Sequence, residues 1–481
     1  MEGTAEEAVE SGRSSLELSP DVMRELADLA TSRIIDRIRT LPQDRPWRGA
    51  DRSELEPVLR EPAPEDGRVP EEVLERAVRD VLPVAGRVDH PRFFAFVPSA
   101  PTWPGVIADY LCAGFNTFQG TWLGSSGPSQ LELVVTDWIR EWIGFPEGAG
   151  GLFTSGGSAA SLDALVAARE AAGAPENPTV YLSDQSHSAL ARAARIVGVR
   201  RSGVRTVPSD ASFRMRVDAL EEMIAEDRAA GFRPIAVCAN AGTTNTGSVD
   251  PMDRIADFCA REGIWLHVDG AYGGFAVLAE EGRAVLGGME RADSVTLDAH
   301  KWLFQPFEAG CLMVRDVRHL DEAFSVRPEY LQDIEWGERN VNFADRGLQL
   351  TRSFRALKVW MSVQTFGLRA FREAIGGGIR LARRAEEYIR GSDTLELLSP
   401  ASLGVVCFRA NPPDVERSEQ ELEALNDAVQ AQVIDAGVAM MSSTRLHDTY
   451  ALRLCVLSHR TVWSDVEDTL KAIERLARAE G

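Results

Sequence analysis

The sequence predicts an α/β protein whose mostly parallel sheet is covered by helices on both faces. Between about residues 93 and 314, short apolar runs alternate with segments that have the spacing of helices. Continuous apolar runs are typical of strands buried on both sides, and their alternation with helices predicts a parallel sheet. The chain has no internal repeat and no low-complexity tract, and its 44% apolar and 26% charged residues are typical of a globular protein.

Composition also limits the partners. The 481 residues suffice for about two to four domains around a substantial core. With 52 basic and 73 acidic side chains the net charge is −21, which repels phosphate backbones and anionic lipid headgroups. No apolar run approaches the roughly 20 residues that span a bilayer. We therefore expect neither a nucleic acid nor a membrane as a partner.

The cysteines and the first residues indicate the compartment. Six cysteines lie far apart, mostly within apolar runs and without a C-x-x-C pair: Cys112, Cys238, Cys259, Cys311, Cys407 and Cys455. We expect buried free thiols, no disulfide framework and no metal site. The acidic start of the chain lacks the basic and apolar regions of a signal peptide, so the expected location is cytoplasmic.

Residues 1–92 predict an N-terminal helical arm. After a start that we expect to be disordered, Ser19–Asp21 combines a helix cap, a first-turn proline and a first-turn acid, and the helix extends to about Leu41. A connector rich in proline and charge follows at 42–69, and a second short helix begins at about Glu71. The arm has no apolar content for a core of its own, so we expect it to pack on a partner subunit.

The large domain, residues 93–375, carries the predicted sheet. The expected strands are Val180–Ser183, Pro234–Ala239, Ile264–Val268, Ser294–Leu297 and Gly310–Val314. The expected helices are Ala159–Ala172, Ala219–Ala230, Met252–Glu262, Arg318–Phe324 and Arg355–Glu373. Ligands of such sheets bind at the carboxyl ends of the strands. The polar segment Arg327–Leu350 is longer than most loops, which favours a functional lid.

Residues 376–481 predict a small C-terminal α/β domain. Its expected strands are Leu403–Arg409 and Tyr450–Ser458. Its expected helices are Ser418–Asp435 and Thr461–Ala479.

A glycine-rich turn precedes the first helix of the large domain. In Thr154–Ser161 (T-S-G-G-S-A-A-S), Gly156 and Gly157 let backbone N–H groups approach a ligand, and Ser158 adds a hydroxyl. The N-terminus of the following helix favours an anion, so the turn is a candidate phosphate site. A flexible helix cap explains the turn equally well.

Three polar side chains stand just after predicted strands. Asp269 and Lys301 follow apolar strands, where a charged group needs a partner or a task, and His187 follows a third strand. Taken singly, each also has a structural explanation: Asp269 as an acid that bonds a loop, Lys301 as a surface lysine and His187 as a structural histidine. Together with the glycine-rich turn, their order matches the needs of pyridoxal phosphate: an anion site, a ring-face partner, an acid for the pyridine nitrogen and a lysine for the aldehyde.

Five motifs carry a resemblance to a known family: H-P-R-F-F-A-F (His90–Phe96), S-D-Q-S-H-S (Ser183–Ser188), W-L-H-V-D-G-A-Y (Trp265–Tyr272), D-A-H-K-W (Asp298–Trp302) and R-S-F-R-A-L-K-V-W (Arg352–Trp360). From about residue 19 to 479, the chain resembles the group II pyridoxal-phosphate decarboxylases, the aromatic-L-amino-acid decarboxylase family. The resemblance implies the type I fold of pyridoxal-phosphate-dependent transferases. It also implies a homodimer with its active site at the subunit interface.

The resemblance assigns roles to single residues. Lys301 matches the lysine that holds the cofactor, Asp269 the acid that keeps the pyridine nitrogen protonated, and His187 the imidazole stacked on the ring. The other matches are Thr244 and Ala271 at the ring, and Gly156, Gly157, Ser158, Ser294 and His300 at the phosphate. Asp298 is a departure, because the family usually has Asn there, and a carboxylate near a phosphate should cost affinity unless it is turned away or compensated.

A second departure lies in the long loop. The family has a Tyr there that protonates the reacting carbon after carbon dioxide leaves, and the matching position is Phe343, which has no proton to give. In relatives with this change, the reaction consumes dioxygen and yields an aldehyde, ammonia, carbon dioxide and peroxide. The alternatives are a slipped alignment or another donor such as Tyr330, which already matches the family's P-x-Y-L motif.

The substrate pocket differs as well. Val88 and Gly120 match positions where the aromatic decarboxylases have a Trp and a Phe around the substrate ring, while Phe118 supplies a new wall and Ser99 is assigned to the same pocket. The larger space favours a bulky amino acid, for example a cysteine-linked conjugate. Tailoring enzymes of lincosamide antibiotic biosynthesis include relatives of this type.

The sequence thus predicts a cytoplasmic, homodimeric enzyme that uses pyridoxal 5′-phosphate on an amino acid. The leading outcome is decarboxylation coupled to oxidative deamination, with dioxygen as co-substrate and no metal. Plain decarboxylation to an amine and β-elimination from a cysteine conjugate stay open. A non-catalytic binding module is disfavoured because Lys301, Asp269 and His187 are all present.

Overall fold

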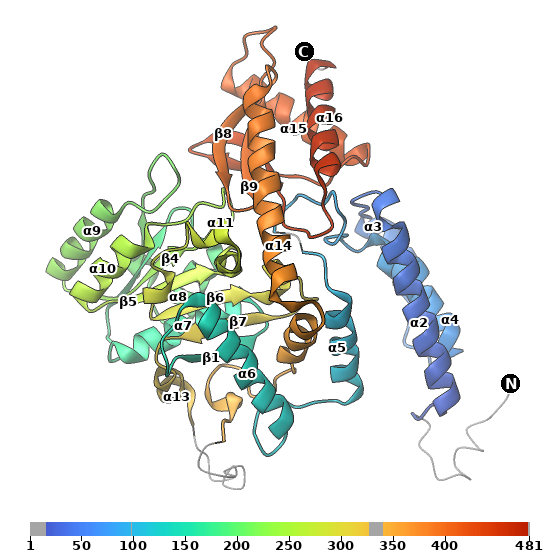
Figure 1. Ribbon diagram of the computed structural model, residues 1–481, viewed down its shortest axis with the longest axis horizontal. Coiled ribbons are helices and arrows are strands. Elements are labelled where there is room, and N and C mark those ends of the chain that lie inside the picture. Colours follow the sequence, from blue (N-terminus) through green and yellow to red (C-terminus); the bar gives the residue numbers. More distant parts are fainter. Residues whose placement is uncertain (1–15, 98, 327–339, 480–481) are drawn as a thin grey trace. The chain divides into compact units, whose positions relative to one another are not determined.

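The computed structural model describes residues 16–97, 99–326 and 340–479 (Figure 1). The chain divides into two compact units, Met1–His90 and Pro91–Gly481. Within the described ranges, the helices are too short or too polar to cross a membrane. All six cysteines are free thiols, as predicted, and five of them are buried.

The N-terminal unit is helical. Its elements are α2 (Pro20–Thr40), η1 (Leu41–Gln43), α3 (Arg52–Leu59), α4 (Pro70–Arg76), η2 (Ala77–Val81) and η3 (Leu82–Val84). The predicted start of the first helix is confirmed, because the Ser19 side chain accepts a hydrogen bond from the backbone N–H of Val22 at 3.3 Å. Arg37 donates to both carboxylate oxygens of Asp89, at 2.6 and 2.7 Å, and Arg33 pairs with Glu75.

The larger unit contains the predicted sheet. Among the described residues its strands lie in the order β1-β7-β6-β5-β4-β2-β3. The bounds are β1 (Gly150–Thr154), β2 (Pro178–Ser183), β3 (Val204–Val207), β4 (Arg233–Asn240), β5 (Trp265–Gly270), β6 (Ser294–Asp298) and β7 (Gly310–Val314). The strands from β6 to β3 are parallel, whereas β7 is antiparallel to both β6 and β1. The fold class and all five predicted strands are confirmed, while β1 and β3, the edge strands, were not predicted.

Helices cover both faces of this sheet, and each face has its own hydrophobic cluster. The helices of the large domain are α5 (Trp103–Gly114), α6 (Ser126–Ile143), α7 (Gly157–Ala171), α8 (Ser188–Ile196), α9 (Val217–Ala229), α10 (Met252–Glu262), α11 (Glu280–Arg283), α12 (Ala299–Trp302) and α13 (Arg318–Phe324). Short 3-10 turns lie at η4 (Arg201–Gly203), η5 (Gly274–Leu278), η6 (Met289–Arg291) and η8 (Phe343–Asp345). One cluster joins α6, α9 and α10 to the sheet, and the other joins α7, α8 and α13 to it.

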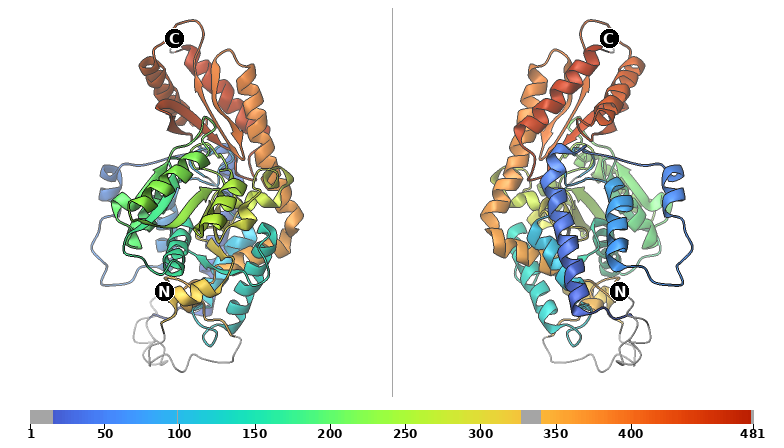
Figure 2. Two further views of the ribbon diagram at one scale, coloured as in Figure 1. Left: turned by 90° about the vertical axis from the view of Figure 1, so that its left-hand side faces the viewer. Right: turned by 90° about the vertical axis from the view of Figure 1, so that its right-hand side faces the viewer.

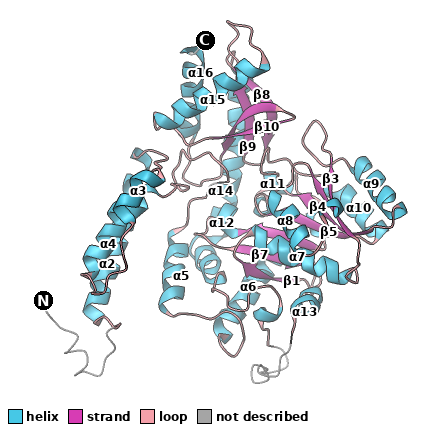
Figure 3. Cartoon of the chain, turned by 180° about the vertical axis from the view of Figure 1, so that it is seen from behind, coloured by secondary structure: helices cyan, strands magenta, loops and turns pink. Residues whose placement is uncertain are grey.

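The C-terminal third forms a second sheet. Its described strands are antiparallel, in the order β10-β11-β9-β8, with bounds β8 (Leu395–Ser402), β9 (Val405–Ala410), β10 (Ser442–Leu446) and β11 (Thr449–Cys455). Figure 3 shows the two sheets as separate groups of magenta strands. The predicted helices appear as α15 (Glu419–Asp435) and α16 (Trp463–Ala479), and Figure 2 shows these orange and red elements gathered at one end of α14.

The long helix α14 (Ala356–Gly391) differs from the prediction, which ended a helix at Glu373. The helix is kinked at Gly367, which has a φ of +70°, and continues through three consecutive glycines. A Cβ at Gly378 would lie 2.7 Å from the carbonyl oxygen of Val456, so the glycine allows the helix to pack closely against the chain after β11. The domain boundary at residue 375 therefore falls inside a helix, and the boundaries at 92 and 375 stay predictions.

Candidate active site

A cavity of about 640 Å³ lies where the parallel strands end. It is lined by residues from the ends of β4, β5 and β6, from the start of α7 and from α12. The sequence-predicted residues among its walls are Gly156, Gly157, Ser158, His187, Thr244, Asp269, Ala271, Asp298, His300 and Lys301. The structure thus brings together segments that are far apart in the chain, at the carboxyl ends of the strands, where ligands of such sheets bind.

Lys301 lies on α12, the short helix that directly follows β6. Its Nζ is 2.8 Å from Oδ2 of Asp298, which is the last residue of β6. The Asp298 side chain is almost completely buried, at 2% exposure, whereas a quarter of the Lys301 side chain is exposed. The lysine therefore has its charge balanced from the sheet side while its amine reaches the cavity.

His300 has a defined tautomer. Its Nδ1 accepts a hydrogen bond from the backbone N–H of Ala309 at 3.0 Å, so the proton of the neutral ring is on Nε2. Burial lowers the pKa of His300, which keeps the ring neutral near pH 7. Nε2 lies 3.6 Å from Oδ2 of Asp298, and a neutral donor therefore borders the cavity.

Asp269 provides a carboxylate at the end of β5. One of its oxygens accepts a hydrogen bond from the backbone N–H of Ala271 at 3.1 Å. Burial raises the pKa of Asp269, and the charge of Lys301 opposes that rise. A buried carboxylate is stabilised by a cation, and a protonated ring nitrogen is such a partner.

The glycine-rich turn forms a close-fitting cradle at the start of α7. Gly156 is the N-cap residue and has no side chain to accept the first N–H groups of the helix, so these are available to an anion. A Cβ at Gly157 would lie 2.9 Å from Cβ of Ala271 and 3.1 Å from Oδ2 of Asp298. A Cβ at Gly310, the first residue of β7, would lie only 2.4 Å from Cα of Gly156. Both glycines are therefore required by the packing around the cradle.

His187 is held at the entrance to α8. It is the N-cap residue, and its Nδ1 accepts a hydrogen bond from the backbone N–H of Ala189 at 3.2 Å. In the neutral ring the proton is therefore on Nε2. An anion cradle, a flat imidazole, a buried carboxylate and a lysine amine in one cavity fit pyridoxal phosphate.

Several residues of the cavity walls were not predicted, and two of them connect the cavity to neighbouring segments. Arg453 comes from β11 of the small sheet and donates from Nε to the carbonyl oxygen of Asn245 at 2.9 Å, from Nη1 to Oγ of Ser442 at 3.0 Å, and from Nη2 to the carbonyl oxygen of Thr244. The arginine thereby fixes the loop that carries Thr244. A charged residue in the middle of the apolar run Y-A-L-R-L-C-V-L was the available signal, because a buried charge needs partners.

Asn240, at the end of β4, is the second of these connecting residues. Its side-chain amide donates to Oδ2 of Asp250 at 2.8 Å and to Oγ of Ser186 at 3.2 Å. Burial raises the pKa of Asp250 to about 6. The amide thus connects the end of β4 to the residue before His187, and nothing in its local sequence indicates that contact.

Ser294 is not brought to this cavity. It is the first residue of β6, at the opposite end of the strand from Asp298, and it is fully buried. Its Oγ accepts a hydrogen bond from Nε1 of Trp265 and is 2.8 Å from Nδ1 of His267. Four residues of strand correspond to about 13 Å, so the serine is too far away for the cradle.

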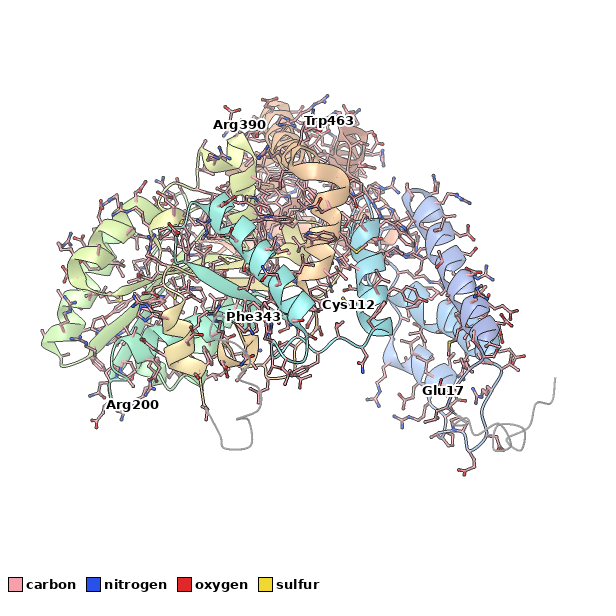
Figure 4. All side chains as sticks on the ribbon, turned by 60° about the horizontal axis from the view of Figure 1, so that its bottom comes forward. Glu17, Cys112, Arg200, Phe343, Arg390 and Trp463 are labelled. Atoms are coloured by element: carbon pink, nitrogen blue, oxygen red, sulfur yellow. The ribbon has the colours of Figure 1, made fainter. Side chains whose placement is uncertain are left out.

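Phe343 is fully buried within the hydrophobic cluster of α7, α8 and α13, outside the walls of the cavity (Figure 4). The guanidinium carbon of Arg352 lies 4.9 Å from the centre of its ring. The backbone N–H of Ala344 donates to the carbonyl oxygen of Gly120 at 2.9 Å, which joins this segment to the predicted substrate pocket. Tyr330 lies outside the described residues.

Phe118 and Gly120 pack against each other. A Cβ at Gly120 would lie 2.3 Å from Cζ of Phe118, so the phenyl ring fills the space that the glycine leaves. Neither residue, nor the buried Ser99, contributes to the walls of the cavity as the described chain forms them. Val88 belongs to the N-terminal unit, and its role in the substrate pocket stays a prediction.

The described residues contain no group of three or more His, Cys, Asp or Glu side chains that could hold a metal ion. The groups that line the cavity fit an organic ligand with an anionic group, an aldehyde and a basic ring nitrogen.

The comparisons with known proteins agree with this chemistry. The family model described as the pyridoxal-dependent decarboxylase conserved domain matches residues 53–411. An aromatic-L-amino-acid decarboxylase of Bacillus atrophaeus is 41% identical over 96% of this chain and 97% of that protein. A phenylacetaldehyde synthase of Arabidopsis thaliana is 31% identical over 97% of this chain and 98% of that protein. A crystal structure of Oryza sativa TDC with PLP and tryptamine superposes with a TM-score of 0.92 at 28% identity, covering 97% of this chain and 100% of that one.

Proposed function

This chain belongs to the pyridoxal-dependent decarboxylase family and uses pyridoxal 5′-phosphate, and on that premise we propose that it converts an amino acid to an aldehyde. The proposed reaction couples decarboxylation to oxidative deamination. Amino acid, dioxygen and water give aldehyde, carbon dioxide, ammonia and hydrogen peroxide, which balances atoms and electrons. The observation that carries the proposal is Phe343 at the position where the resemblance predicts a Tyr.

The residues of the cavity have separate tasks in this reaction. Pyridoxal phosphate, when bound, supplies an aldehyde that captures the substrate's amino group and a ring that withdraws electrons from the breaking bond. Lys301 provides the amine that attaches the cofactor, and Asp269 holds a proton on the ring nitrogen. His187 supports the ring face, and the N–H groups of Gly157 and Ser158 at the start of α7 bind the phosphate.

In the proposed reaction the fate of the substrate carbon depends on position 343, whose phenyl ring is buried outside the cavity walls of the described chain. A tyrosine hydroxyl there would return a proton to the carbon that has lost carbon dioxide, and the product would be an amine. A phenyl ring has no exchangeable proton, so the electron-rich carbon persists long enough to be oxidised by dioxygen. The similarity to a phenylacetaldehyde synthase supports this outcome.

The test is product analysis with and without dioxygen. The wild-type protein in air should consume one dioxygen for each aldehyde and release an equal amount of peroxide. Phe343→Tyr should shift the product towards the amine by at least tenfold. Phe343→Leu, which also lacks a hydroxyl, is the matched control and should still give the aldehyde. An amine as the main wild-type product in air would overturn the proposal.

Plain decarboxylation to the amine is the second candidate. The decarboxylase from Bacillus atrophaeus, with 41% identity, favours it. In that case oxygen consumption would be absent and Phe343→Tyr would change the rate without changing the product. The same experiment therefore separates the two candidates, and a released thiol would indicate β-elimination instead.

The substrate is proposed to be a bulky amino acid. The cavity of about 640 Å³ has room for the cofactor together with an amino acid side chain. Because Phe118 fills the space beside Gly120, an aromatic or thioether group would meet an apolar wall there once the pocket is complete. A panel of aromatic, aliphatic and cysteine-conjugate substrates, compared by kcat/KM, tests this part of the proposal.

A further inference from the structure

Asp298 is a cavity residue with one carboxylate oxygen that lacks a hydrogen-bond partner among the described residues. One carboxylate oxygen, Oδ2, lies 2.8 Å from Nζ of Lys301. The other, Oδ1, is buried and has no hydrogen-bond partner among the described residues. A buried acceptor without a partner is costly, so it indicates that a donor or a proton arrives at this atom in another state of the protein.

The same carboxylate borders the anion cradle. A Cβ built on Gly157 would lie 3.1 Å from Oδ2, so the carboxylate is next to the first residue of α7. An anion bound to the N–H groups of that helix would therefore have Asp298 as a neighbour. A phosphate monoester carries a charge of about −1.5 to −2 at pH 7, and two anionic groups at this distance in a buried site repel each other strongly.

The positive charge paired with Asp298 is that of Lys301. The other cations near the cavity have partners of their own: Arg453 bonds the carbonyl oxygens of Thr244 and Asn245, Lys358 pairs with Asp109 and Arg355 pairs with Glu308. On the same short helix, His300 is neutral because burial lowers its pKa. On β5, His267 is neutral, with a pKa lowered to about 3 by burial, and Asp269 is a second acid. On β7, burial keeps Cys311 a neutral thiol by raising its pKa, and the first turn of α7 carries only small or uncharged residues. Lys301 is thus the cation next to the cradle that is not paired elsewhere, and it already balances the charge of Asp298 as long as this carboxylate is ionised.

We propose that Asp298 takes up one proton from solvent when the phosphate group binds, so that cofactor loading is coupled to pH. The proton bonds to the carboxylate, which becomes a neutral carboxyl group with one O–H donor, and nothing is oxidised or reduced. The carboxyl group then presents a donor and an acceptor, as the amide of an asparagine does. Rising pH makes the proton harder to obtain and weakens binding of the phosphorylated cofactor. This inference rests on the cofactor site alone and does not depend on whether the product is an aldehyde or an amine.

The test compares cofactor affinity in the wild type and in Asp298→Asn. Dissociation constants of pyridoxal phosphate are measured between pH 6.5 and 8.5 by the absorbance of the bound cofactor. The ratio of the wild-type constant to that of D298N should rise with pH, by up to tenfold per unit. Pyridoxal, which has the aldehyde but no phosphate, is the probe for the chemistry at Lys301, and its ratio should stay constant. A flat ratio for pyridoxal phosphate, or the same slope for both probes, would overturn the proposal.

A second measurement needs no variant. Titration calorimetry in buffers with different ionisation enthalpies counts the protons exchanged on binding. The wild-type protein should take up about one proton more with pyridoxal phosphate than with pyridoxal, at a pH where the free phosphate is fully ionised. Asp163→Asn, which neutralises another buried acid on α7, is the matched control and should leave this difference unchanged. An equal proton count for the two probes would contradict the proposal, even if D298N failed to fold.

Discussion

Asp163 is a buried acid whose charge is poorly compensated. It lies on α7 at 3% exposure, and its Oδ1 accepts a hydrogen bond of 3.4 Å from the backbone N–H of Leu348. A Cβ at Gly347 would lie 2.9 Å from Oδ2, so the backbone that follows the long loop packs directly on this carboxylate. Burial raises the pKa of Asp163 to about 7, although Arg352 and the backbone N–H oppose the rise. The side chain is therefore half protonated near neutral pH.

This pKa makes stability depend on pH in a defined direction. An unfolded Asp titrates near pH 4, so the folded protein binds more protons than the unfolded chain between about pH 4 and 7. The free energy of unfolding that Asp163 contributes is complete below pH 4 and is lost as pH rises to 7, by up to about 4 kcal/mol. Asp163→Asn should therefore gain thermal stability relative to wild type as pH is raised from 5 to 7.

The measurement is the difference in Tm between the two proteins at several pH values. The difference should level off above pH 7. Asp36→Asn, at an acid with 53% side-chain exposure on α2, is the control and should show no such trend. A constant difference for D163N would show that groups other than Arg352 and the backbone N–H of Leu348 compensate the carboxylate.

At the residue scale, the sequence located the chemistry but not its partners. Lys301, Asp269 and His187 were found because each follows a strand, and strand ends meet at one edge of a parallel sheet. The ion pair between Asp298 and Lys301 and the contacts of Arg453 depend on side-chain packing across long stretches of chain, which local patterns do not encode. The same limitation explains Ser294, which shares a strand with Asp298 but lies at the wrong end of it.

At the element scale, the start of α7 depends on glycine. Gly157→Ala would place a methyl group 2.9 Å from Cβ of Ala271, and Ala271 is held by its backbone and cannot move aside. The first turn of α7 would have to shift away from the cradle. We expect the dissociation constant of pyridoxal phosphate to rise at least tenfold, which corresponds to about 1.4 kcal/mol, with an unchanged circular dichroism spectrum.

The matched control is Gly127→Ala near the start of α6. A Cβ there meets nothing within 4 Å, so the affinity for the cofactor should stay as in wild type. An unchanged affinity of G157A would mean that the cradle tolerates a side chain, and the assignment of the phosphate site to this turn would be wrong.

The spacing of apolar residues was sufficient to predict the bounds of several helices. The bounds of α10 were predicted to the residue, and those of α7, α9, α15 and α16 within two residues, because apolar spacing and caps agree there. Helix α14 continues past the predicted end at Glu373 and through three consecutive glycines, which have low helix propensity. Of the three, Gly378 packs closely against the backbone of Val456, and this tertiary contact outweighs the low helix propensity of glycine.

At the scale of the whole molecule, the N-terminal arm indicates a homodimer, which we propose from the family resemblance and from α2. On this helix Met23, Ile34 and Ile35 are exposed, with 40–47% of each residue's surface accessible to solvent. None of the described residues of the helix is buried. Light scattering should give about twice the chain mass of 52.6 kDa. Replacing Ile34 and Ile35 together by Asp should shift the protein towards the monomer at low concentration, because charges at a contact oppose its burial.

Ser32→Asp, at an exposed polar position of the same helix, is the control and should leave the mass unchanged. A monomeric wild-type protein, or an unaffected double variant, would exclude the arm as the dimer contact.

The fold as a whole was predictable because its sheet is buried on both sides. Central strands are continuous apolar runs, whereas the edge strands β1 and β3 and the strands β8 and β10 of the small sheet have weaker patterns and were missed. The small sheet was recognised as a domain from half of its strands. The start of this domain could not be determined from the sequence, because α14 continues across the expected boundary at residue 375.

Gly310 is a residue outside the anion cradle that the packing of the cradle nevertheless requires to be glycine. It opens β7, lies between Thr154 and Asp298 in the register of the sheet, and leaves no room for a Cβ against Gly156. A saturation mutagenesis screen should therefore find this position as intolerant as any that touches the ligand, although it belongs to the supporting layer beneath. Anyone evolving the enzyme towards new substrates would do well to hold codon 310 constant and diversify the walls instead.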